Sequence, residues 1–233
     1  MTNLQPHRPR HTPEYADVCL RAISAAGLDA VITIGGGLGL LHYLDYRSTF
    51  DVDAWWSPTA SPAARRQLVE VVEAALQTLG AVHRREWGEV VSVELHAGGA
   101  RVFSFQIAER SAQLRAAESV AWTSVPVDSL DDLVASKMTA LTERGAPRDF
   151  RDIHALCEAD LSTPTACWRA WAARQELSGS DRDLQRARLA IETHLARIER
   201  HRPLAEIPDA DERAAASALR TWFKEVFLHA DLD

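Results

Sequence analysis

The chain has 233 residues, a hydrophobic fraction of 46%, a charged fraction of 25% and a formal net charge of −7 at pH 7. This length allows one large domain or two small ones with a sizeable core, and the composition is ordinary for a globular protein. The negative net charge excludes a globally basic nucleic-acid binder, so a nucleic-acid partner would need a local basic patch.

The sequence also argues against a membrane or secreted protein. No apolar run approaches the length of a membrane span, and the first 15 residues are polar and lack the apolar core of a signal peptide. The three cysteines, Cys19, Cys157 and Cys167, are far apart and lack the paired spacing of a zinc site. We therefore expect a cytoplasmic protein with reduced thiols and no membrane contact.

The first half of the chain alternates between helical and strand-like patterns. Apolar spacing predicts helices over 14–26 and from the capping segment Ser61-Pro62 to Gly80. A short helix is predicted over 37–44, directly after the glycine run that begins at Gly35. Short apolar or alternating runs predict strands over 30–34, 50–56, 81–86, 90–96 and 101–108.

After Pro126 the pattern becomes helical to the end of the chain. Helices are predicted over 129–144, 149–160, 164–177, 181–201 and 210–229. The sequence therefore predicts an α/β part over residues 1–125 and an all-α part over residues 126–233.

The most informative segment is a glycine turn followed by an acidic strand. Gly35, Gly36 and Gly37 separate a strand from a helix, so their backbone N–H groups can approach a phosphate at the positive end of that helix. Asp51 and Asp53 stand two residues apart in a strand and so face the same side. Paired carboxylates suit Mg²⁺, which leaves other positions for water and substrate phosphates. A phosphate site beside a metal site is typical of phosphoryl or nucleotidyl transfer.

Each of these features also has a purely structural explanation, as a tight turn or an exposed strand face. Thr49 precedes the acidic pair, and its hydroxyl could hold a phosphate or support the metal. Arg47 could bind phosphate in bidentate fashion or pair with Asp45. Trp55 and Trp56 face opposite sides, so we expect one in the core, and the other is a candidate for stacking on a base.

The order Gly-Gly, then Arg-x-Thr-x-Asp-Val-Asp, resembles the DNA polymerase β-like nucleotidyltransferase superfamily. A second segment, from Lys137 to Ile153, carries a Lys…Arg…Arg-Asp-x-x-Asp-hydrophobic pattern. This pattern is similar to that of the AbiEii/AbiGii toxin-type nucleotidyltransferases, which include the MenT toxins. The resemblance implies an α+β fold, in which a small mixed sheet with helices is followed by a helical C-terminal region that completes the active-site cleft.

The resemblance also assigns roles within the second segment. It implies that Lys137 contacts the triphosphate and that Arg148, Asp149 and Asp152 close the site or hold its shape. Asp152 could also be structural and orient Lys137 or Arg47. The alternative is a solvated charge cluster at a helix junction. Lys137 is one of only two lysines in the chain, which makes its position in a motif more informative.

One feature departs from the superfamily pattern, in which a later strand usually carries a third carboxylate. The polar side of the strand over 101–108 presents Ser104 and Gln106 instead of an acid. Glu94, on the neighbouring strand, could substitute, with Glu89 and Glu109 as weaker choices. The general base therefore stays unassigned.

A further set of basic residues is scattered among acids in the last part of the chain. We interpret it as a solvated face, with a tRNA-binding surface as the alternative. The set comprises Arg182, Arg186, Arg188, Arg197, Arg200 and Arg202.

These observations favour a Mg²⁺-dependent nucleotidyltransferase that transfers NMP from an NTP to an acceptor. The resemblance implies tRNA as the acceptor and a role as the toxin of a bacterial toxin–antitoxin or phage-defence system, with a separate antitoxin. One alternative is a small-molecule nucleotidyltransferase that modifies an antibiotic. Another is a non-catalytic nucleotide-binding protein on the same fold, suggested by the missing third acid. The sequence leaves open which NTP, acceptor and antitoxin are used.

Overall fold

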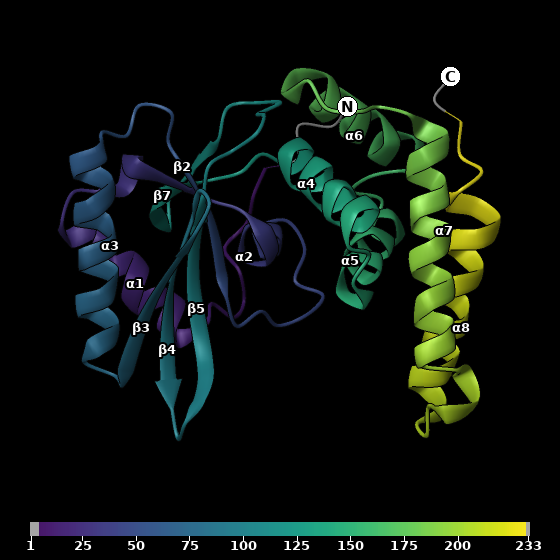
Figure 1. Ribbon diagram of the computed structural model, residues 1–233, viewed down its shortest axis with the longest axis horizontal. Helices are drawn as coiled ribbons and strands as arrows, with labels where there is room; N and C mark the ends of the chain where they lie inside the picture. The colour runs from purple at the N-terminus through teal and green to yellow at the C-terminus, as the bar shows by residue number, and fades with distance from the viewer. Residues whose placement is uncertain (1–4, 232–233) are drawn as a thin grey trace. The chain divides into compact units, whose positions relative to one another are not determined.

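The computed structural model describes residues 5–231, and the predicted α+β fold is confirmed there. The chain divides into two compact units, the first ending at Leu133 and the second beginning at Val134. The division falls inside helix α4 (Leu130–Glu143). Figure 1 shows the elements of both units, and each unit is described by itself below.

The first unit is built around one mixed sheet with the strand order β3-β4-β5-β2-β1-β7-β6. The strands β2 and β5 run parallel, as do β1 and β7, while the other neighbouring pairs are antiparallel. The strands are β1 (Ile32–Ile34), β2 (Val52–Trp56), β3 (Ala81–Trp87), β4 (Val90–Ala97), β5 (Ala100–Ala108), β6 (Glu118–Val120) and β7 (Thr123–Val127).

The two-residue period of the strands gives this sheet one apolar and one polar face. Val52, Phe103 and Phe105 are buried on the apolar face, which α3 (Pro62–Gln77) and α1 (Glu14–Ala25) cover. Asp53 and Ser104 alternate with these residues and therefore point to the other face. The short helix α2 (Gly36–Leu41) packs against β2. The candidate functional residues of this unit thus lie opposite the main helix layer.

The sequence did not predict β6 and β7. Residues Pro126 and Asp128 indicated a break in the pattern, because proline cannot donate a ladder hydrogen bond. The strand β7 nevertheless forms because Val125 and Val127 are both fully buried, and Val127 pairs with Ile34 of β1. Tertiary burial here outweighs the local signal.

The second unit is helical, with α5 (Pro147–Glu158), α6 (Pro164–Ser178), α7 (Leu184–His201) and α8 (Ala210–Trp222). The predicted helix over 210–229 is too long, because α8 ends at Trp222 and a π-helical turn follows over Phe223–Phe227. This turn belongs to the core: the Trp168 indole donates to the Phe227 carbonyl at 3.1 Å. No helix in the described part of the chain is long and apolar enough to cross a membrane.

The second unit offers a sharp test of its packing at Gly145, just after α4. This residue has φ +50°, and a Cβ there would lie 2.5 Å from Cδ2 of His194, whose ring bonds the Thr142 carbonyl at 3.1 Å. We expect Gly145→Ala to lower the free energy of unfolding by about 2–4 kcal/mol, from overpacking plus left-handed strain. At about 2–4 °C per kcal/mol, thermal denaturation followed by circular dichroism would detect this loss.

Gly179→Ala is the matched control for this substitution. Gly179 has φ +67°, and a Cβ there would meet nothing within 4 Å. Only the backbone strain of about 1–2 kcal/mol applies to it. Equal losses of Tm in the two variants would contradict the close packing of α4 on α7.

Candidate active site

The glycine turn and the acidic strand touch each other in the first unit. Gly36 adopts φ +55°, and a Cβ at this position would lie 2.5 Å from Cβ of Asp53 and 2.7 Å from its carboxylate carbon. The backbone N–H of Gly35 donates to the Asp53 carbonyl at 2.9 Å. Only glycine fits at position 36, both for its backbone conformation and for its distance to Asp53.

The neighbouring glycine faces the other two residues of the motif. A Cβ on Gly37 would lie 3.0 Å from Thr49 Oγ1 and 3.2 Å from Arg47 Nη2. Asp45, considered above as a partner of Arg47, accepts hydrogen bonds from His7 and from the backbone N–H of Arg10, each at 3.1 Å. The structure therefore brings the glycine turn, Arg47, Thr49 and the acidic strand to one place.

The carboxylate of Asp51 is fixed by β5. Its Oδ1 accepts from the backbone N–H and the hydroxyl of Ser104, both at 3.0 Å. Gln106, which pairs with Asp53 across the sheet, donates to the same hydroxyl at 3.3 Å. Within residues 5–231, no hydrogen bond or ion pair engages the Asp53 carboxylate. The serine and glutamine that replace a third acid thus orient one carboxylate of the pair.

The residues present fit a divalent cation that arrives with a nucleotide. No group of three or more His, Cys, Asp or Glu able to hold a metal occurs within residues 5–231. Asp51 and Asp53 supply two carboxylates, and the space that a Cβ would fill at Gly36 lies directly against Asp53. Mg²⁺ commonly binds one or two carboxylates and completes its shell with water and substrate phosphates.

Glu94 lies on the same face as the acidic pair but is engaged elsewhere. It is opposite Ser104 in the β4–β5 register, and its side chain is only 7% exposed. Its carboxylate contacts Arg85 at 3.6 Å, Arg101 at 3.7 Å and His96 at 3.3 Å. We therefore do not assign Glu94 as the third metal ligand.

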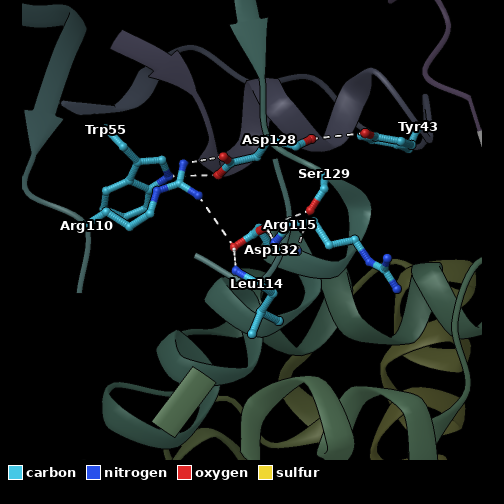
Figure 2. A network of polar contacts seen from close by, with 8 residues as sticks. All are labelled: Tyr43, Trp55, Arg110, Leu114, Arg115, Asp128, Ser129 and Asp132. Atoms are coloured by element: carbon cyan, nitrogen blue, oxygen red, sulfur yellow. Dashed lines mark hydrogen bonds and ion pairs between the residues drawn. The ribbon is translucent and has the colours of Figure 1, made fainter. Parts of the chain in front are cut away.

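Behind the glycine turn lies a buried polar network that sequence reasoning missed (Figure 2). The Asp128 carboxylate accepts from the Trp55 indole at 2.9 Å and pairs with Arg110, whose side chain is 9% exposed. A Cβ on Gly35 would lie 3.1 Å from Asp128 Oδ2. Burial raises the pKa of Asp128 to about 6, although Arg110 opposes the shift.

This network gives Trp55 a structural role, because its indole N–H is used inside the protein. Trp56 is buried, as expected for one of the two tryptophans. The sequence signals for the network are the pair Asp128-Ser129 before a predicted helix and Asp132 three residues after Ser129, which resembles a capping box.

The same network fixes the start of α4. Asp132 accepts hydrogen bonds from the backbone N–H groups of Leu114 at 2.8 Å and Arg115 at 3.0 Å, and from the Ser129 hydroxyl at 2.7 Å. The Ser129 hydroxyl in turn accepts from the Asp132 N–H at 3.1 Å and so caps the helix. The loop after β5 and the first turn of α4 are therefore held together by one buried carboxylate.

In the second unit, three charged residues of the second motif are buried, namely Lys137, Asp149 and Asp152. Lys137 Nζ lies 2.6 Å from Asp152, and both side chains are buried. Asp149 is fully buried and accepts two hydrogen bonds from Arg144 at 2.9 Å and one from the Ala146 N–H at 3.1 Å. Arg148 is exposed. The two aspartates therefore do not belong to a solvated charge cluster. Arg144 is the partner of Asp149, which the sequence did not predict.

The fold and these two motif segments define the class of protein as a nucleotidyltransferase. The sequence matches the family described as "Nucleotidyl transferase AbiEii toxin, Type IV TA system" over residues 18–224. The chain belongs to this AbiEii family, which confirms the prediction of a nucleotidyltransferase of this type and disfavours a non-catalytic protein. No curated protein matches the chain.

Solved structures give a likeness of fold. A candidate nucleotidyltransferase from H. pylori has 15% identity and a TM-score of 0.50, covering 93% of this chain and 97% of its own. ANT(2")-Ia, solved with adenylyl-2"-tobramycin, has 18% identity and a TM-score of 0.45, covering 69% and 94%. A nucleotidyltransferase-like protein from Paracoccidioides brasiliensis has 17% identity and a TM-score of 0.41, covering 88% and 91%. The first likeness concerns the fold alone, and the other two support no conclusion.

The contact between Gly36 and Asp53 generates a direct prediction. Gly36→Ala would place a methyl group against the Asp53 carboxylate at a left-handed backbone position. We expect the affinity for NTP to fall at least about tenfold, because the turn must open to relieve the clash. Gly98→Ala, at φ +58° with nothing within 4 Å, is the matched control. Isothermal titration with NTP measures both variants, and an unchanged affinity in folded Gly36→Ala would limit the turn to a structural role.

Proposed function

We propose that this protein transfers NMP from an NTP to tRNA with Mg²⁺, as the toxin of a bacterial toxin–antitoxin or phage-defence system. The observation that carries the proposal is the contact of Gly36 with Asp53. It puts the backbone of the glycine turn against one carboxylate of a pair that shares a strand face, and a metal–nucleotide complex needs both kinds of group. Membership of the AbiEii toxin family supports the toxin role.

In this proposal, Asp51 and Asp53 hold Mg²⁺, and the backbone N–H groups of Gly36 and Gly37 bind the phosphates. The N–H of Gly35, expected from the sequence to join them, donates to the Asp53 carbonyl instead and holds the turn against the strand. Bound Mg²⁺ would supply Lewis-acid stabilisation of the charge that develops on the phosphates. Ser104 keeps Asp51 oriented through its two hydrogen bonds.

The remaining motif residues complete the proposed nucleotide site. Thr49 and Arg47, which face Gly37, add a hydroxyl and a guanidinium for phosphate. For Lys137 and Arg148, in the second unit, contact with the triphosphate is proposed from the family resemblance alone. Asp152 holds the Lys137 ammonium, and Asp149 holds the turn before α5 through the Ala146 N–H. Catalysis is then positioning of the acceptor hydroxyl and neutralisation of charge, with pyrophosphate as the leaving group.

A labelling experiment identifies the acceptor. The protein would be incubated with each α-³²P-labelled NTP, Mg²⁺ and total tRNA, and the RNA resolved on a denaturing gel. The account expects label on tRNA with one NTP preferred, and none when EDTA replaces Mg²⁺. Label on an aminoglycoside and none on RNA would instead favour the small-molecule alternative. An antitoxin partner is a further part of the proposal, tested by rescue of growth on co-expression.

The carboxylate pair leads to a prediction that separates activity from folding. Asp53→Asn and Asp51→Asn should each lower NMP transfer at least about a hundredfold, because each removes charge from the metal site. The fold should survive, since the Asp53 carboxylate has no partner in residues 5–231 and an asparagine oxygen at position 51 can still accept from Ser104. We expect Tm to stay within about 2 °C of wild type.

Asp17→Asn on α1 provides the control, because this half-exposed acid lies on the helix layer across the sheet. Its transfer rate should equal that of wild type. Wild-type transfer by Asp53→Asn would remove the metal site from this account.

Lys137 gives a second prediction, in which stability and activity must be measured separately. Lys137→Ala should lower kcat/KM for NTP roughly tenfold to a hundredfold, the loss of one charge-assisted hydrogen bond. It should also destabilise the protein by about 3–5 kcal/mol, because the ion pair with Asp152 is buried. Lys137→Arg should recover part of both. Lys224→Ala is the control, since Lys224 is half-exposed and pairs with Glu199 at the surface. A normal KM for NTP in Lys137→Arg and Lys137→Ala would exclude the phosphate contact.

A further inference from the structure

The polar face of the sheet does not stop at the acidic pair but continues across three strands to an edge. Asp53 pairs with Gln106 of β5, Gln106 with Ser92 of β4, and Ser92 with Arg85 of β3. With strands about 4.8 Å apart, the Arg85 backbone lies about 14 Å from that of Asp53 along this row. The next row runs from Ser104, which binds Asp51, through Glu94. The face therefore connects the candidate active site with the edge strand β3.

Basic and aromatic side chains gather on the outer part of this face, and we call them the basic–aromatic face. Alternation along β3 places His83, Arg85 and Trp87 on the side of the sheet that carries Glu94. Arg84 points to the opposite side, where it contacts Glu73 of α3. Arg85 is 66% exposed, Arg101 48% and Trp87 47%. The basic–aromatic face consists of His83, Arg85, Trp87, His96 and Arg101.

These side chains are held in place by one buried acid. Glu94 contacts Arg85, Arg101 and His96 within 3.7 Å. The Arg85 guanidinium also lies 5.8 Å from the centre of the Trp87 ring. Two arginines against one carboxylate leave the face with net positive charge. The cluster is thus pre-organised, which reduces the entropy lost when it binds a ligand.

This chemistry fits a single-stranded nucleic acid better than another protein chain. Exposed aromatic rings stack on bases while arginines contact phosphates, whereas charged residues on an edge strand discourage pairing with a further strand. Three arginines of the basic set near the C-terminal end of the chain are instead paired within the protein: Arg186 with Asp181, Arg202 with Glu212, and Arg197 with the Arg144 carbonyl. In a chain of net charge −7, a local patch of this kind is required for RNA binding.

We propose that the basic–aromatic face binds the single-stranded segment of an RNA acceptor next to its attacking hydroxyl. Trp87 stacks on a base, Arg85 and Arg101 contact the backbone phosphates, and the strand runs along the polar face toward Asp51 and Asp53. This inference rests on the proposed function, because it assumes an RNA acceptor at the same active site.

The test measures RNA binding independently of catalysis. Fluorescein-labelled total tRNA would be titrated with the full-length protein at several salt concentrations, and fluorescence anisotropy would give Kd and its salt dependence. The logarithm of the association constant falls linearly with the logarithm of salt concentration, by about 0.7–0.9 per phosphate contact. The double variant Arg85→Ala/Arg101→Ala loses two such contacts, so this dependence should become less steep by about 1.4–1.8. Trp87→Ala should raise Kd about fivefold or more, the loss of one stacked base.

Matched controls come from the opposite side of the sheet. Arg21→Ala/Arg66→Ala removes two exposed arginines from α1 and α3, and Leu79→Ala removes an exposed apolar side chain. Both should bind tRNA as wild type does. Affinity for NTP should be unchanged in every variant.

The outcomes separate this inference from the proposed function. NMP transfer to tRNA that is as efficient in the face variants as in wild type, with the same Kd and salt slope, overturns the inference and leaves the proposed function standing. Binding of tRNA that depends on this face, in a protein that transfers no NMP to it, supports the inference and overturns the proposed acceptor. Equal losses in the control variants, or no tRNA binding by wild type, overturn the inference.

Discussion

The candidate active site depends on the close approach of a bare backbone to a carboxylate. Gly36 can lie against Asp53 only because it has no side chain and accepts a left-handed conformation. The neighbouring glycines are also closely packed: a Cβ on Gly35 would lie against Trp55 and Asp128, and one on Gly37 would lie against Thr49. Three consecutive glycines are therefore a packing requirement of the turn, and the phosphate-binding capacity of its N–H groups follows from the same absence of side chains.

The support of this turn is electrostatic as well as steric. Asp128 is buried enough for its pKa to rise to about 6, yet it retains the Arg110 guanidinium and the Trp55 indole as partners. A buried charge with good partners holds its surroundings in one geometry at little net gain in stability. Because side chains alternate along each strand, the sheet has an apolar face covered by α1 and α3 and a polar face. The polar face carries the two acids together with Ser104 and Gln106, which orient Asp51.

Much of this arrangement could be predicted from the sequence, because its signals are local. The glycine turn, the alternation of Asp51 and Asp53, and the strand patterns over 90–96 and 101–108 are set by residues close together in the chain. The strands β6 and β7 could not be predicted, since β7 contains Pro126 and depends on the burial of its valines and on pairing with β1 and β6. The Trp55–Asp128–Arg110 network joins residues 18 to 73 positions apart and carries no periodic signal. The sequence shows that Ser104 stands where a third acid is usual, but it does not show that Ser104 donates hydrogen bonds to Asp51.

The central claim is that the glycine turn and the acidic pair bind one metal–nucleotide complex. A crystal structure of the protein with Mg²⁺ and a non-hydrolysable NTP analogue tests it most directly. The account predicts triphosphate oxygens within hydrogen-bond distance of the Gly36 and Gly37 N–H groups, and Mg²⁺ between those oxygens and the carboxylates of Asp51 and Asp53. A nucleotide bound elsewhere, with both carboxylates in contact with water alone, would contradict it.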